Sequence, residues 1–226
     1  MATDRDRMNL FKSILFLIQK EFLLEWRQKY AIGGILLYVF STVFIVFIAS
    51  QDVEAAVWNS LFWIVVLFAS VNAIVKSFTQ ENGNRAIYYY TLLNPIAVLL
   101  SKMIYNVLLL SLISLLTYLS FVLFINDPVQ DLERFFLATF LGAMGFSIAL
   151  TFISAIASKA NNSATLMAIL GFPVIIPILL TVVRLSEKSF ETEFPTKIGD
   201  NIAVLGAIDL ILLGMSLILF PFLWRE

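Results

Sequence analysis

Few side chains in this sequence could carry out chemistry. It contains no His and no Cys, so the commonest general base, the commonest haem and zinc ligand, and any thiolate metal site are missing. Its nine glycines form no GxxxxGK[ST] phosphate-binding loop, so the chain has no such means of binding ATP. One ionisable residue, Asp209, lies deep within a long apolar stretch. We therefore expect a non-enzymatic chain with no catalytic residue, no metal ligand and no cofactor of its own.

The composition is that of a membrane protein. Hydrophobic residues make up 60% of the 226 residues, charged residues make up 14%, and the formal net charge is −1. Soluble domains are usually about 45–50% apolar and about 25% charged. A net charge near zero, with no basic patch, also argues against nucleic-acid binding. The sequence thus predicts a polytopic membrane protein.

Six apolar stretches are long enough to cross a bilayer as helices, because about 20 residues are needed. They cover residues 30–50, 55–75, 103–125, 135–158, 160–183 and 201–224. Only Lys159 and a few polar residues separate the fourth from the fifth, so these two could form a tight hairpin or be partly re-entrant. Four aromatic residues lie at or within a turn or two of span ends, as an interfacial aromatic belt would require, namely Trp58, Trp63, Trp224 and Tyr30. We expect an all-α membrane protein whose six-span domain covers residues 30–226.

The distribution of basic residues predicts the orientation. If both termini are cytoplasmic, 11 of the 15 Lys and Arg residues lie inside and four lie outside. Before the first span, residues 1–29 contain Phe11, Leu15, Ile18 and Phe22 at helical spacing. We interpret this segment as an amphipathic helix in the cytoplasmic interface. The alternative is a simple lead-in to the first span.

The longest cytoplasmic loop covers residues 76–102. Its first part is polar, whereas residues 86–100 carry no charge and include three consecutive Tyr. Such a segment is too short to span the membrane, and Pro95 ends its first helix because the residue before a proline avoids the α region. We interpret residues 80–93 as a short helix that docks on another protein, although burial among lipid headgroups suits Tyr equally well. The candidate docking residues are Gln80, Glu81, Gly83, Arg85, Tyr88, Tyr89, Leu92 and Pro95.

Polar residues within the spans are candidates for gating. Asp209 could serve transport or relay a proton, since an ionisable group inside a membrane is costly. A carboxyl group that fixes helix packing through a hydrogen bond to Asn72 or Asn59 would explain it as well. Because Asp209 is alone, we slightly favour the packing role, and we keep Asp209 and Asn72 as gating candidates.

Two neighbouring spans carry residues that shape helix packing. Pro173 and Pro177 should kink the fifth span, which makes it a candidate gate or dimer contact, although a merely tolerated kink is commoner. Gly142 and Gly145 belong to a line of small residues in the fourth span. Such a line permits the close approach of another helix.

The order of these elements and four motifs resemble a known family. The motifs are residues 22–27, residues 80–83 followed by 92–102, residues 156–170, and residues 171–180 with their proline pair. The chain resembles the CcmB-like family of the cytochrome c maturation haem exporter, which forms the membrane part of a type-2 ABC exporter. The similarity covers about residues 10–224. The chain departs from it at Ala86, where the family often has Glu, so the charge pattern that faces the ATPase is reorganised.

The resemblance implies a multi-pass permease subunit of the bacterial inner membrane with both termini in the cytoplasm. Its implied partners are an ABC ATPase that grips residues 80–93, a haem-handling membrane protein of the exporter, a further small membrane protein of the exporter, a second copy of the chain, and membrane lipid. ATP would bind to the ATPase, and haem would be ligated by a partner protein, because this chain has no His. Two other functions stay open from the residues alone: a secondary carrier or channel that uses Asp209, and a non-transporting membrane scaffold.

Overall fold

The computed structural model describes residues 4–27, 29–49, 53–74, 93–158, 163–191 and 198–225. Over these ranges the chain forms helices and no strand, which confirms the expected all-helical fold. The helices are α1 (Asp4–Arg27), α2 (Lys29–Ala49), α3 (Ala55–Ile74), α6 (Pro95–Phe124), α7 (Leu132–Ala157), α8 (Ser163–Glu187) and α9 (Ile198–Arg225).

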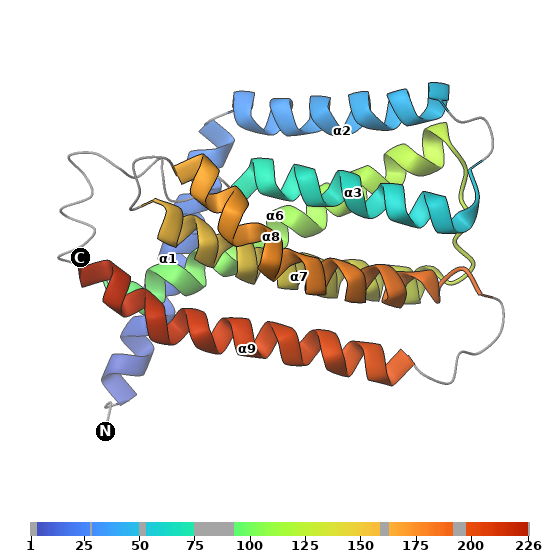
Figure 1. Cartoon of the computed structure of the whole chain (residues 1–226). Coiled ribbons are helices and arrows are strands. Elements are labelled where there is room, and N and C mark those ends of the chain that lie inside the picture. The colour runs from blue at the N-terminus through green and yellow to red at the C-terminus, as the bar shows by residue number, and fades with distance from the viewer. Residues whose placement is uncertain are drawn as a thin grey trace.

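Helix α1 crosses one end of the bundle, and the other helices run roughly along one axis (Figure 1). Both chain termini lie at this end. Five helices in the described parts of the chain are long and apolar enough to span a membrane, namely α3, α6, α7, Thr165–Glu187 of α8 and Gly199–Trp224 of α9. Helix α2 contains a shorter apolar stretch, Gly33–Ala49. Large apolar side chains remain exposed on the outer faces of these helices, as lipid contact requires in an integral membrane protein.

The helix of the third predicted span is longer than the sequence indicates. It begins at Pro95 rather than at Met103, so residues 95–102, which the sequence pattern assigns to the cytoplasmic loop, are the first turns of α6. The Asn94 side chain accepts a hydrogen bond from the backbone N–H of Ile96 at 2.9 Å. Pro95 occupies the first helical turn, where its missing N–H costs nothing. Pro95 therefore begins a helix here.

An aromatic cluster closes the end of the bundle opposite the termini. Trp58 stacks on Phe62 with ring centroids 5.6 Å apart, and it contacts Phe121, Phe135 and Phe190 edge to face. The indole N–H of Trp58 donates to a backbone carbonyl oxygen at 3.0 Å. Because this polar atom is satisfied inside the protein, the whole ring can be buried.

The prediction that Trp58 and Trp63 form an interfacial belt is wrong, because both are 0% exposed. Trp63 donates its indole N–H to Ser186 Oγ of α8 at 2.7 Å. Ser186 Oγ donates in turn to Asn59 Oδ1 at 2.8 Å, and the Asn59 amide donates to the carbonyl oxygen of Val183 at 3.0 Å. This buried network ties α3 to α8.

Candidate functional site

Most of the predicted docking residues lie outside the described part of the chain. Gln80, Glu81, Gly83, Arg85, Tyr88, Tyr89 and Leu92 all fall within residues 75–92. Of the predicted docking residues, Pro95 alone is described. The structure describes the two elements that flank this segment. They are the end of α3 at Ile74 and the first turns of α6, and we call them the frame.

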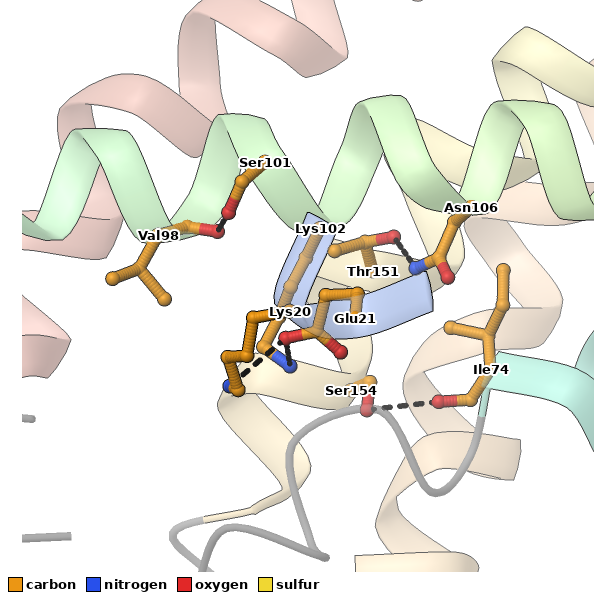
Figure 2. Close-up of polar contacts among 9 residues, drawn as sticks. All are labelled: Lys20, Glu21, Ile74, Val98, Ser101, Lys102, Asn106, Thr151 and Ser154. Atoms are coloured by element: carbon orange, nitrogen blue, oxygen red, sulfur yellow. Dashed lines mark hydrogen bonds and ion pairs between the residues drawn. The ribbon is translucent and has the colours of Figure 1, made fainter. Parts of the chain in front are cut away.

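Buried hydroxyl groups of α7 hold this frame together (Figure 2). Ser154 Oγ donates to the carbonyl oxygen of Ile74 at 3.4 Å, which satisfies an acceptor at the end of α3. Thr151 Oγ1 accepts a hydrogen bond from the Asn106 amide of α6 at 2.8 Å, and Ser147 Oγ donates to a backbone carbonyl of α6 at 2.8 Å. Ser147, Thr151 and Ser154 share one face of α7 because they are four and three residues apart. One face of α7 thus contacts both flanks of residues 75–92.

An ion pair joins α1 to α6 within the same region (Figure 2). Lys102 Nζ lies 3.2 Å from Glu21 Oε1, and Lys20 Nζ lies 3.2 Å from the same oxygen. The side chain of Lys102 is 2% exposed and that of Glu21 is 14% exposed. A buried charge needs an opposite charge and hydrogen bonds to offset its lost hydration. The sequence pattern does not reveal this pair, because it places Lys102 in the loop.

Apolar contacts flank the ion pair on both sides along α1. Leu17 is buried in a cluster that includes Ala97, Val98 and Leu99 of α6. Directly after Glu21, the Phe22 ring meets the ring of Tyr105, which lies about one turn after Lys102 in α6, edge to face with centroids 5.1 Å apart. On the opposite face of α1, large apolar residues stay exposed, and these include Phe11, Phe16 and Leu23. Helix α1 therefore has one face against the bundle and a second apolar face that is free to meet lipid.

Asp209 lies in α9 against α7, apart from this cluster. Its side chain is 2% exposed, and neither carboxyl oxygen has a hydrogen-bond partner among the described residues. A Cβ atom on Gly145 of α7 would lie 2.7 Å from Asp209 Oδ1, so glycine provides the room for the carboxyl group. The expected partners are engaged elsewhere, since Asn59 bonds to α8 and Asn72 is exposed.

The two prolines of the fifth span lie within the continuous helix α8, and both are exposed. Thr181 Oγ1 donates to the carbonyl oxygen of Pro177 at 2.7 Å. On another side of α8, a cavity of about 190 Å³ opens between α3, α7 and α8. Its lining is apolar and includes Phe68, Leu150 and Ile175, so it offers no ligand for an ion.

Long apolar helices, exposed apolar faces and a polar frame around one connecting segment define an integral membrane protein of the multi-pass helical class. A family model described as CcmB protein matches residues 12–224. The chain therefore belongs to the CcmB family, whose members are membrane permease components of haem export and are not enzymes in themselves. A search of the curated proteins found no match.

Proposed function

We propose that this chain is the membrane-spanning permease subunit of an ABC haem exporter used in cytochrome c biogenesis. The observation that carries this proposal is the family match over residues 12–224. In the proposed complex, an ABC ATPase supplies the energy, a haem-handling membrane protein and a further small membrane protein are additional partners, and a second copy completes the membrane part. The complex lies in the bacterial inner membrane, and both termini face the cytoplasm.

The proposed contact with the ATPase is the segment that includes Glu81 and Tyr89. Support comes from the frame on either side of it. Ser154 bonds to the end of α3 on one side, whereas the Asn94 cap and the Lys102–Glu21 ion pair hold the start of α6 on the other. A displacement of the segment would therefore act on α1, α3, α6 and α7 together. Such a connection is the physical requirement for converting ATP-driven motion into motion within the membrane.

The part that responds to this motion is proposed to include α8 and α9. The side of α8 that faces α3 and α7 borders the apolar cavity, so the helix can shift there without breaking a polar contact. At the far end, the network around Ser186 holds α8 to α3. Pro173 and Pro177 lie within the stretch of α8 that lines the cavity and are the proposed gating positions. Asn72 and Asp209 are further gating candidates, although a packing role is favoured for Asp209.

The orientation is supported by charge and geometry together. Both termini and α1 lie at the same end of the bundle (Figure 1). The side that carries the termini also carries 11 of the 15 basic residues in the sequence-based assignment. Basic residues are retained on the cytoplasmic side of a membrane.

Co-purification from native membranes tests the proposal. The tagged chain should bring down an ABC ATPase and a haem-containing membrane protein. Glu81→Ala or Tyr89→Ala should release the ATPase, whereas Glu54→Ala should not, because Glu54 is exposed next to α3 at the opposite end of the bundle. If the ATPase stays bound to both docking variants with unchanged ATP turnover, the docking segment is wrongly assigned. If the unmodified chain transports alone in vesicles without an ATPase, it is a secondary carrier.

A further inference from the structure

We propose that Glu21 and Lys102 are positioning residues that make α1 and the first turns of α6 move as one rigid unit during the transport cycle. The inference rests on the proposed function, because it assigns to this unit the transfer of motion from residues 75–92. The amphipathic helix would then be a working part of the coupling mechanism. A passive membrane anchor would have no need of such a connection.

The burial of Lys102 is the first observation. A lysine near the end of a membrane helix can extend its long side chain to the interface and keep its charge in water. Here the ammonium group turns inward instead, and its side chain is 2% exposed. The ammonium group donates to Glu21 Oε1 at 3.2 Å, and Glu21 belongs to α1 and lies 81 residues earlier in the sequence. Separating the two helices would leave both charges in a poorly hydrated environment, which opposes the separation strongly.

Contacts before and after the ion pair are the second observation. Ahead of the ion pair in both helices, Leu17 of α1 belongs to one apolar cluster with Ala97, Val98 and Leu99 of α6. After the ion pair in both helices, Phe22 of α1 meets Tyr105 of α6. Because the contacts follow each other along both helices, sliding α1 along α6 would disrupt all of them at once.

The position of the pair along the chain is the third observation. Helix α6 is continuous from Pro95 through Lys102, and it begins shortly after the proposed docking segment. Backbone hydrogen bonds make such a helix stiff, so a displacement at its first residue reaches Lys102. From Lys102, the ion pair passes the displacement to α1.

Cross-linking tests whether α1 and α6 move together. The sequence has no cysteine, so Phe22→Cys with Tyr105→Cys introduces the only two thiols. In the assembled complex, a short bifunctional thiol reagent would join them, and ATP-dependent haem release would be compared before and after reaction in the same sample. We expect the two rates to agree within about twofold. A cross-linked complex that loses haem release would show that the helices separate, and it would overturn the inference.

Charge variants provide a second test that does not depend on the thiols. Glu21→Gln and Lys102→Met each remove the ion pair that joins α1 to α6, so we expect haem release per ATP to fall by about tenfold while the ATPase still co-purifies. The double variant should recover at least about half of the loss, because it removes both members of the buried pair together and neither is left without the other. Lys20→Met is the matched control. It removes a cation from the same oxygen, but its side chain is 22% exposed, so the change should stay within about twofold.

The outcomes separate this inference from the proposed function. The unmodified complex is measured first, and absence of an ATPase or of ATP-dependent haem release would refute the proposed function. If the unmodified complex is active and the single variants release as much haem per ATP as it does, only the role of the ion pair is refuted. A double variant no better than the worse single variant would do the same, because the two residues would then act separately.

Discussion

The contact between Gly142 and Trp63 allows a direct test of how α7 packs on α3. A Cβ atom placed on Gly142 would lie 2.6 Å from Cη2 and 2.9 Å from Cζ3 of Trp63, and 3.1 Å from a methyl group of Val182. Carbon atoms do not approach this closely without displacement. The Trp63 ring cannot move freely, because it is 0% exposed and its N–H is bonded to Ser186 at 2.7 Å. Gly142→Ala should therefore destabilise the bundle.

The cost can be estimated from the two ways of relieving the clash. If α7 moves away from α3, the overpacking should cost about 1–3 kcal/mol. If the Trp63 ring moves instead, its buried N–H loses its partner, which costs about 1–3 kcal/mol as well. Replacing Gly by Ala in a helix returns about 0.5–1 kcal/mol. The cost less this gain leaves a fall in the free energy of unfolding of up to about 2.5 kcal/mol for Gly142→Ala, with a central value of about 1 kcal/mol.

Reversible unfolding in detergent, followed by tryptophan fluorescence, measures this change. Gly214→Ala is the matched control, because nothing lies within 4 Å of the added Cβ atom and only the gain in helix propensity remains. Trp63→Phe gives a second control. Phe lacks the two ring atoms nearest to Gly142, so Gly142→Ala should cost less in that background. Equal stability of Gly142→Ala and Gly214→Ala would refute the reasoning.

Three further predictions concern other polar positions. Ser186→Ala should lower the free energy of unfolding by about 1–3 kcal/mol because it leaves the Trp63 N–H unpaired, whereas Ser60→Ala, whose exposed hydroxyl bonds only to its own helix, should change it little in the same assay. Asn94→Ala should cost about 1 kcal/mol through loss of the N-cap, and Asn94→Ser should recover most of it. Asp209→Asn should keep most haem release, because the amide matches the carboxyl group in size and neither carboxyl oxygen has a partner among the described residues. Loss of release in a normally assembled complex would instead give Asp209 a mechanistic role.

The membrane class and the helical fold could be predicted because they depend on properties of short segments. A bilayer requires about 20 successive apolar residues, and this requirement can be read along the chain without knowing any contact. The small residues of α7 are a similar case. Gly142 and Gly145 indicated close packing, and the structure places Trp63 and Asp209 against them. The sequence could not identify these partners, because no local rule specifies which helix fills a gap.

The start of α6 shows where a local rule is misleading. Asn94 followed by Pro95 is a signal for a helix start, but a search for uncharged stretches excludes everything up to Lys102. A charge at that position looks incompatible with burial. The structure resolves this conflict, since Glu21 of α1 provides the opposite charge that offsets the burial of Lys102.

By itself, the sequence determined that the chain is helical, that it spans the membrane several times, and that it contains no phosphate-binding loop for ATP. Composition, hydrophobic length and local motifs determine these properties along the chain. Only the tertiary structure decided that Trp58 and Trp63 are core residues, that Asp209 contacts Gly145, and that Glu21 pairs with Lys102. A buried polar atom needs a partner, and residues distant in the sequence supply that partner once the helices have packed.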